Sequence, residues 1–318
     1  MRVDPDNYVA YDNLAEAYTG LNRLEEAKAI LNSALQRKIG GLFPHFYLSL
    51  IAVAQGDRAT QEREDALLKG DAQRELNLAS RDASLAAYRG QLKQARELFM
   101  RASQMALGLD LKESAAAAIA DEAVTEADFG YRAEAARGAT AALAVSRTAD
   151  VVYSAARTLA LAGEANEAET LIVELGKRRP KDVGVHSVEV PEVKAINEIN
   201  RGNPTKAIEL LETATPYDGG FWFGVRYTRG KAYLRAGNGD KAAEEFQKVL
   251  ALRNWLWALS YTSPRMSLPE LGLARAYALQ GDQATSRMAY QDFLALWKDA
   301  DPDIPILQQA KVEYAKLR

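Results

Sequence analysis

Apolar residues near the start of the chain recur at helical spacing. Four of them fall at i, i+3, i+4 and i+7 and so share one face of a helix: Tyr11, Leu14, Ala15 and Tyr18. A short polar turn at 20–22 follows, and a second apolar stripe then runs from Leu24 to Ala34. This pattern predicts an antiparallel pair of helices within residues 7–38.

Eight glycines mark turns at which one helical stretch ends and another, Ala-rich stretch begins. They are Gly20, Gly56, Gly90, Gly130, Gly163, Gly202, Gly237 and Gly281, and the successive gaps are 36, 34, 40, 33, 39, 35 and 44 residues. A recurrent spacing in the thirties, with helical periodicity on both sides, is typical of an α-solenoid. Each helix pair cannot bury its apolar face alone and must stack on its neighbours.

The first unit resembles a known repeat. Tyr11-x2-Leu14-Ala15-x2-Tyr18, followed by Ala27-x3-Leu31, is similar to the tetratricopeptide repeat (TPR) pattern of W-x2-L-G-x2-Y and A-x3-F. Partial matches recur later: Gly230-x2-Tyr233 with Ala242-x3-Phe246, and Leu273-Ala274-x2-Tyr277 with Tyr290. The resemblance implies an all-α fold, a right-handed α-solenoid of about eight TPR-like helix pairs plus a C-terminal capping helix at 302–318.

We expect one TPR-like solenoid over residues 1–318, with some irregular stretches. Residues 1–7 are similar to the tail of a preceding repeat, so the chain would begin inside a longer array. The glycines within 215–224 predict a hinge, and an aromatic insert at 253–270 lengthens the last gap. The polar stretch 57–75 makes the second unit degenerate, and Arg226 and Arg229 stand where the repeat pattern has large apolar residues.

A narrower resemblance concerns the segments 232–250 and 272–318. They resemble the C-terminal TPR region of large bacterial Ser/Thr protein kinases and of some winged-helix transcriptional regulators. The resemblance implies a non-enzymatic protein-binding or sensory module whose effector domain, a kinase in the first instance, lies outside this chain. A winged-helix regulator and a stand-alone TPR adaptor are the alternatives. We expect a soluble segment that is cytoplasmic, or extracytoplasmic if the parent carries an upstream membrane span, and the oligomeric state is left open.

Composition narrows the function classes. Lys and Arg number 40 against 43 Asp and Glu, which gives a net charge of −3. Because nucleic-acid binders carry a clear basic excess, we expect no nucleic-acid partner for this chain. The absence of cysteine and the presence of two histidines exclude thiol nucleophiles, disulfides and zinc sites built from Cys and His. The longest apolar run, 42–54, is shorter than the roughly 20 residues of a membrane span, so we expect no span in this chain.

No catalytic constellation stands out in the sequence. Residues 237–242 match G-x-G-x-x-A, but a helical stretch precedes them where the dinucleotide-binding motif has a strand. We therefore interpret them as an inter-helix turn. The P-loop and the kinase catalytic motifs are absent from the sequence. We predict no enzyme activity, no cofactor and no metal site for this chain itself.

The repeat register places cations together with tyrosines in the C-terminal half. Counting back from the turn glycines gives six residues on the inner helix faces: Tyr153, Arg157, Tyr227, Lys231, Arg235 and Arg275. Each tyrosine precedes a cation by four residues and so shares its face. We expect a protein or peptide partner with an acidic segment or a C-terminal carboxylate, with unrelated surface charge as the alternative. The chain does not resemble the carboxylate-clamp subclass, because Asp12 and Glu16 stand where that clamp needs cations and amides.

The four tryptophans, Trp222, Trp255, Trp257 and Trp297, all lie in the last third of the chain. The first three belong to the irregular stretches at 215–227 and 253–270. Aromatic inserts of this kind either wall a ligand pocket or fill the wider gap that an insert makes between helix pairs. We keep both interpretations for Trp222, Trp255 and Trp257.

Overall fold

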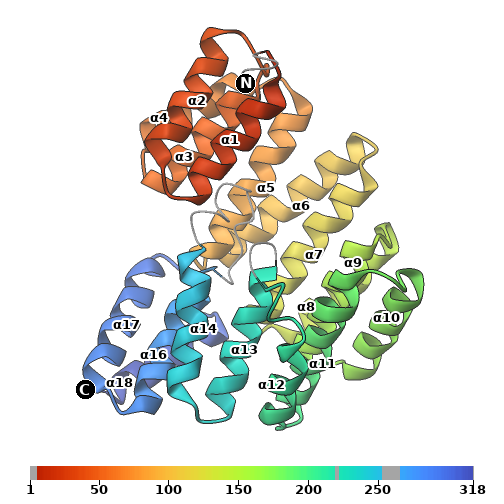
Figure 1. Ribbon diagram of the computed structural model, residues 1–318, viewed down its shortest axis with the longest axis vertical. Coiled ribbons are helices and arrows are strands. Elements are labelled where there is room, and N and C mark those ends of the chain that lie inside the picture. The colour runs from red at the N-terminus through yellow and green to blue at the C-terminus, as the bar shows by residue number, and fades with distance from the viewer. Residues whose placement is uncertain (1–5, 219–221, 253–265, 318) are drawn as a thin grey trace. The chain divides into compact units, whose positions relative to one another are not determined.

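The computed structural model describes residues 6–218, 222–252 and 266–317, and these residues form helices joined by short connections (Figure 1). The predicted all-α helical-repeat fold is confirmed. The described residues form two compact units. Unit 1 contains 6–81 and 251–252, and unit 2 contains 82–218, 222–250 and 266–317. None of the described helices is long and apolar enough to cross a membrane.

Unit 1 begins with the helix pair that the apolar stripes predict. Its helices are α1 (Tyr8–Gly20), α2 (Leu24–Gln36), α3 (Phe43–Gln55), α4 (Arg58–Leu67) and α5 (Ala72–Tyr88), whose last residues belong to unit 2. The Asn7 side chain accepts a hydrogen bond from the backbone N–H of Val9 and so caps the start of α1. Ala15, Ala27 and Leu31 are fully buried where α1 and α2 meet.

Unit 2 continues the series of helix pairs. Its helices are α6 (Leu92–Gly108), α7 (Lys112–Phe129), α8 (Arg132–Val145), α9 (Ala149–Ala162), α10 (Ala165–Arg178), the π-helix η1 (Val185–Glu189), α11 (Val190–Asn200), α12 (Pro204–Glu212), α13 (Phe223–Arg235), α14 (Gly239–Ala251), α16 (Leu268–Gln280), α17 (Gln283–Leu296) and α18 (Pro305–Ala315). The last of these lies within the predicted capping helix at 302–318.

The predicted turn glycines lie between the helices of each pair. Seven of the eight have positive φ angles, from +71° at Gly56 to +104° at Gly130. A residue with a Cβ is strained in this left-handed conformation, so glycine ends these helices without that cost. Gly20 is the exception: it is the last residue of α1, and Asn22 takes the left-handed conformation in that turn with φ +58°.

A glycine of the repeat motif has a packing role in unit 2. The Phe246 ring of α14 is fully buried and lies between Gly230 of α13 and Gly272 of α16. A Cβ at either glycine would stand 2.7 Å from a ring carbon of Phe246, which is too close for any real side chain. The three helices can therefore share one aromatic ring only because both positions are glycine.

The two arginines that depart from the repeat pattern are held by carboxylates. Arg229 of α13 is 5% exposed and donates hydrogen bonds to Glu245, at 2.9 Å, and to Asp218. Arg226 binds the same Asp218 at 3.1 Å. A buried guanidinium is tolerated when carboxylates pair with it and use its hydrogen-bond donors, so α13 keeps cations where the pattern expects apolar side chains.

Polar side chains also hold together the part of unit 1 that contains the degenerate polar stretch 57–75. Arg81 of α5 is 2% exposed and donates to both carboxylate oxygens of Asp65 on α4, at 2.8 Å each, and to the Ser49 hydroxyl of α3 at 2.6 Å. Burial raises the pKa of Asp65, but the bonds from Arg81 and Ser49 outweigh it and hold that pKa below its usual value. His45 Nδ1 lies 2.7 Å from the buried Glu64 carboxylate in the same layer.

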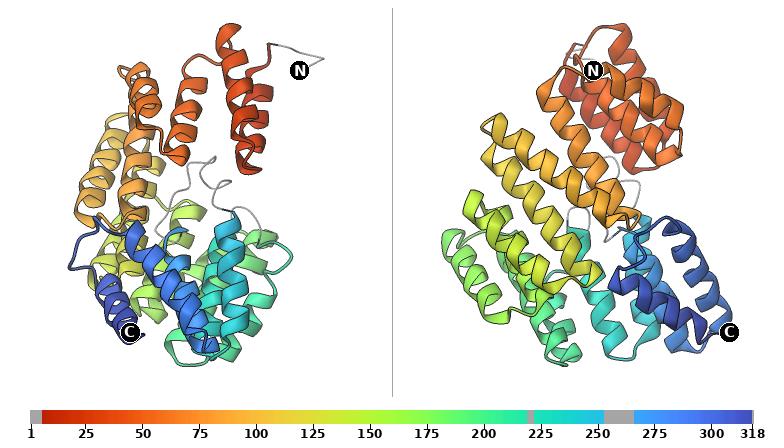
Figure 2. Two further views of the ribbon diagram at one scale, coloured as in Figure 1. Left: turned by 90° about the vertical axis from the view of Figure 1, so that its left-hand side faces the viewer. Right: turned by 180° about the vertical axis from the view of Figure 1, so that it is seen from behind.

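The beginning and the end of unit 2 are in contact (Figure 2). Trp297, which follows α17, is 2% exposed, and its indole N–H donates to the Tyr88 carbonyl at 3.0 Å although 209 residues separate the two. Its ring centroid lies 5.0 Å from that of Phe129 on α7 and 4.9 Å from that of Phe293 on α17. Helix α18 in turn packs against both α7 and α17.

We call residues 297–305 the clasp, because they contact two early turns of unit 2. In the turn after α5, the Asp301 N–H donates to the Gly90 carbonyl at 3.0 Å, and the Asp301 carboxylate accepts from the Lys93 N–H of α6 at 2.8 Å. In the turn after α7, the Tyr131 hydroxyl donates to the Asp303 carbonyl at 3.1 Å. The clasp thus joins the last pair of the unit to its first turns.

Some predictions about irregular stretches fall outside the described residues. These are residues 1–5 of the predicted tail, residues 219–221 of the predicted hinge and residues 253–265 of the aromatic insert. The single solenoid over 1–318 stays a prediction.

Candidate ligand-binding cavity

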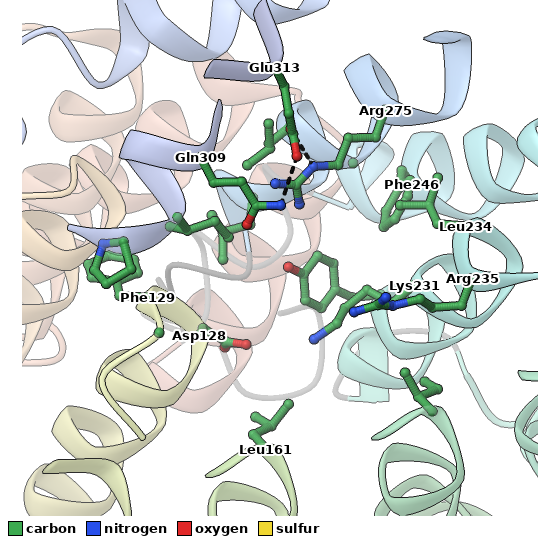
Figure 3. Close-up of a pocket in the computed structure, with 18 of the residues that line it drawn as sticks. Asp128, Phe129, Leu161, Lys231, Leu234, Arg235, Phe246, Arg275, Gln309 and Glu313 are labelled. Atoms are coloured by element: carbon green, nitrogen blue, oxygen red, sulfur yellow. Dashed lines mark hydrogen bonds and ion pairs between the residues drawn. The ribbon is translucent and has the colours of Figure 1, made fainter. Parts of the chain in front are cut away.

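Unit 2 contains a cavity of about 750 Å³ (Figure 3). Helices from both ends of the unit line it, from α7 and α9 to α16, α17 and α18. Apolar side chains such as Leu161, Ile196 and Leu271 contribute much of the wall. The clasp brings α18 next to α7, so the two ends of the unit close the wall together.

The polar part of the wall is predominantly basic. Its cations are Arg132, Lys231, Arg235, Arg275 and Lys316, and its carboxylates are Asp128 and Glu313. Five cations against two carboxylates contrast with the net charge of −3 of the whole chain. Because the apolar walls keep the local dielectric low, these charges act more strongly on an anion in the cavity than they would on open surface.

Helix α13 supplies the cations of one wall. Lys231 and Arg235 lie one turn apart on it, and both line the cavity. The Lys231 ammonium stands 5.4 Å from the ring centroid of Tyr227, one turn earlier. Tyr227 is only 6% exposed, so its ring makes a cation–π contact with the lysine and is barely accessible to a ligand.

The opposite wall contains a carboxylate held by three donors. Glu313 of α18 accepts hydrogen bonds from Arg275 Nε of α16 at 2.9 Å and from the Gln309 amide at 2.8 Å (Figure 3). It also accepts one from the Tyr290 hydroxyl of α17 at 2.9 Å. Burial, and to a smaller extent the charge of Glu313, raises the pKa of Tyr290 above its usual value, so its hydroxyl stays a donor at neutral pH. Arg275 Nη2 is buried and has no hydrogen-bond partner among the described residues.

The structure therefore brings four of the six predicted groove residues to one cavity: Tyr227, Lys231, Arg235 and Arg275. Tyr153 and Arg157 of α9 lie outside its lining. The Tyr153 hydroxyl instead donates to Glu192 of α11, which also accepts from the Thr228 hydroxyl of α13 at 2.8 Å. Burial, and to a smaller extent the charge of Glu192, raises the pKa of Tyr153 well above its usual value. The Arg157 guanidinium stands 5.8 Å from the Tyr153 ring centroid.

Trp222 lies away from the cavity. It immediately precedes α13 and packs with the apolar cluster that α11, α12 and α13 share. A Cβ at Gly184 would stand 2.8 Å from its ring. Trp255 and Trp257 lie outside the described residues, so the aromatic pocket of the three tryptophans stays a prediction.

Sequence reasoning missed several residues that line the cavity. Counting back from the turn glycines does not identify four of them, namely Arg132, Gln309, Glu313 and Lys316. Gln309 and Glu313 lie four residues apart on α18, and Lys316 immediately follows the helix three residues later, which is the spacing of one polar helix face. That signal could have shown which face of α18 is polar. It could not have shown that this face lines a cavity, because the cavity forms only where the two ends of unit 2 meet.

One segment of the chain matches a family model. Residues 8–38, which contain α1 and α2, match the tetratricopeptide repeat model. No curated protein matches the chain.

Several solved structures are similar to it at low identity. MamA of AMB-1 is 20% identical over 56% of this chain and 96% of its own, with a TM-score of 0.31. A tetratricopeptide repeat protein from Parabacteroides merdae is 17% identical over 78% of this chain and 91% of its own, with a TM-score of 0.34. Yeast Tom70 is 13% identical over 97% of this chain and 88% of its own, with a TM-score of 0.34.

The helical repeat is evident from the matched residues 8–38 and from the helix pairs themselves. The unit of two antiparallel helices and a glycine turn recurs through both compact units. The described residues thus form an all-α helical-repeat fold, in which residues 8–38 match a tetratricopeptide repeat.

Proposed function

We propose that this chain is a non-catalytic protein-binding module and that the basic cavity of unit 2 binds an acidic segment of its partner. The observation that carries the proposal is the excess of cations around an apolar-walled cavity in a chain that is acidic overall. Opposite charge in a partly desolvated site favours both encounter and charge-assisted hydrogen bonds.

The size of the cavity supports a short segment of the partner. A volume of about 750 Å³ lies within the range of roughly 300–1,000 Å³ for sites that bury small ligands. A few side chains of a peptide fit this volume, whereas a whole folded partner needs additional surface. Lys231 and Arg235 would contact the acidic side chains from α13, and apolar residues such as Leu234 and Leu271 would contact the methylene groups.

The test uses fluorescein-labelled peptides and fluorescence anisotropy with the full chain. An acidic decapeptide of Glu and Leu should bind, and a peptide with Lys in place of each Glu should not. Charge reversal by Lys231→Glu or Arg235→Glu should each weaken acidic-peptide binding about tenfold or more, because each replaces attraction by repulsion. Binding should also weaken with added salt, since salt screens the exposed part of these charges.

A matched control makes the same charge change elsewhere. Arg101→Glu alters an exposed residue of α6 that does not line the cavity. It should leave the affinity within about twofold of the unmodified chain. Equal losses for Arg101→Glu and Lys231→Glu would mean that net charge alone attracts the peptide, and the proposed site would be wrong.

The parent protein is a separate part of the proposal. The resemblance of 232–250 and 272–318 to the C-terminal region of bacterial Ser/Thr kinases favours a kinase parent, for which this chain would be a docking or sensory arm. Sequencing the source DNA upstream of the Met1 codon tests it. An open frame with kinase motifs supports the proposal, a winged-helix segment supports a transcriptional regulator, and a stop codon with a ribosome-binding site supports a stand-alone adaptor.

A further inference from the structure

One carboxylate inside the basic cavity already has the contacts that an acidic ligand would make. Glu313 receives a guanidinium N–H from Arg275, a hydroxyl from Tyr290 and an amide N–H from Gln309, all at 2.8–2.9 Å. These donors come from α16, α17 and α18, so two of the three lie outside the helix that carries the carboxylate. Such a convergent set of donors is what a carboxylate-binding subsite requires.

The geometry points to an internal competitor. We infer that Arg275 and Tyr290 form a subsite for the side-chain carboxylate of an acidic segment, and that Glu313 of the same chain occupies this subsite until the ligand displaces it. This inference rests on the proposed function, because it names the contact by which the cavity would hold an acidic partner.

Only the side chain of Glu313 needs to move for the exchange. Helix α18 itself is anchored by apolar residues, since Ile304, Leu307 and Ala310 are all at most 1% exposed. The side chains of Glu313 and Arg275 are in contrast 25% and 27% exposed, so solvent and an incoming ligand can reach the pair. A partly exposed ion pair contributes little net stability, so replacing Glu313 by a ligand carboxylate requires little free energy.

The surrounding charges favour an incoming carboxylate over an empty subsite. Lys231 and Arg235 line the same cavity from α13 (Figure 3). Lys316, about one turn after Glu313, lines it as well. If Glu313 swung out to solvent with nothing in its place, the buried part of Arg275 would lose its partner, which is costly. A ligand carboxylate would restore those hydrogen bonds and would meet the remaining cations as well.

Competition lowers the apparent affinity by the fraction of molecules in which the subsite is free. Glu313→Gln keeps the size of the side chain and removes its charge. With Glu313 in place about nine-tenths of the time, this variant should bind the acidic decapeptide about tenfold more tightly than the unmodified chain. Gln309→Ala, which removes one bond that holds Glu313, should give a smaller gain of about twofold.

The experiment compares five proteins in the same anisotropy titration: the unmodified chain, Glu313→Gln, Arg275→Gln, the double variant, and Glu209→Gln. Arg275→Gln should weaken binding about tenfold, and Glu313→Gln should give no gain when combined with it. Glu209 is an exposed residue of α12, so Glu209→Gln makes the same net-charge change as Glu313→Gln outside the cavity and should leave affinity unchanged. Circular dichroism of each variant checks that it is folded.

The outcomes separate this inference from the proposed function. Binding that depends on Lys231 but is the same in Glu313→Gln as in the unmodified chain would overturn the internal competitor and leave the proposed function standing. No binding by the unmodified chain or by Glu313→Gln would overturn both. An amidated peptide should bind as well as one with a free C-terminus, and a requirement for the free C-terminus would overturn the assignment to a side-chain carboxylate.

Discussion

Units 1 and 2 are built from the same helix pairs but are held together in different ways. Among the described helices α1–α5 of unit 1, polar contacts join adjacent helix pairs, as in Arg81 of α5 with Ser49 of α3, which are 32 residues apart. Unit 2 has such contacts too, and in addition the clasp joins residues 209 apart, as in Trp297 with Tyr88. The contact in unit 1 is a charged network, whereas the closure of unit 2 centres on a buried aromatic ring. The comparison teaches that contacts between adjacent helix pairs can be supplemented by a contact between the first and last helices of an array.

The sharpest test of this difference is Trp297→Ala. Removal of a buried tryptophan leaves a cavity and deletes the hydrogen bond to Tyr88, so we expect a loss of about 3–5 kcal/mol in the free energy of unfolding of unit 2. Hydrogen exchange measured by mass spectrometry should show faster exchange at 82–93 and 127–131, the segments that the clasp contacts. Met288→Ala, at a residue of α17 that is 62% exposed, is the control and should change stability by less than about 0.5 kcal/mol. Unchanged exchange in both segments for Trp297→Ala would contradict a closing role.

The corresponding test in unit 1 is Arg81→Met. The variant keeps most of the side-chain volume but leaves the Asp65 carboxylate without its guanidinium partner, so we expect a loss of about 2–4 kcal/mol. Urea unfolding followed by exchange should place the loss in residues 43–81. The double variant with Asp65→Asn should be less destabilised than the sum of the single changes, because no unpaired carboxylate remains. Additive losses would show that packing, and not the ion pair, holds α4 to α5.

A smaller effect concerns how the stability of unit 1 depends on pH. Burial, and to a smaller extent the charge of Glu16, raises the pKa of Asp12 in unit 1 to about 6 from its usual 3.8. The folded state therefore binds the Asp12 proton more tightly than the unfolded state, and the resulting stability is complete below pH 3.8 and is lost as the pH rises through about 6. Because the side chain is partly exposed, we expect Asp12→Asn to stabilise unit 1 by only about 1 kcal/mol at pH 7 and by nothing at pH 3.5.

Urea midpoints of Asp12→Asn and the unmodified chain from pH 3.5 to pH 8 test this expectation. Asp292→Asn, which removes one carboxylate at an exposed residue of α17, is the matched control in unit 2. A difference for Asp12→Asn that is constant across this range would show that Asp12 titrates normally in the folded chain.

Much of the fold followed from local patterns in the sequence. The apolar stripes of the first pair and the turn glycines are local signals, and each maps onto a helix or a turn of the structure. The register also placed Lys231, Arg235 and Arg275 on one cavity, because each repeat positions its inner face in the same way. Tyr153 and Arg157 follow the same register, yet Tyr153 bonds to Glu192, since the partner on the next helix decides what a side chain contacts.

The closure of unit 2 could not be predicted from the sequence. Trp297 has the same sequence signature as any apolar residue at the end of an amphipathic helix. Its contacts with Tyr88 and Phe129 depend on the small rotation between successive pairs, summed over the whole unit. For the same reason the final helix was expected to be a solvent-facing cap, whereas α18 also lines the cavity with Gln309, Glu313 and Lys316.

Closure by Trp297 also imposes an order on how unit 2 is made. Translation proceeds at about 5–20 residues per second, so the ribosome needs roughly 10–40 s to add the 209 residues between Tyr88 and Trp297. Once Phe129 has been synthesised, the apolar surface around it lacks the ring that covers it in the finished chain until the end of that time. Repeat arrays held only by neighbours complete each pair as it emerges. Unit 2 instead leaves apolar surface of its early helices uncovered until its last helices are synthesised.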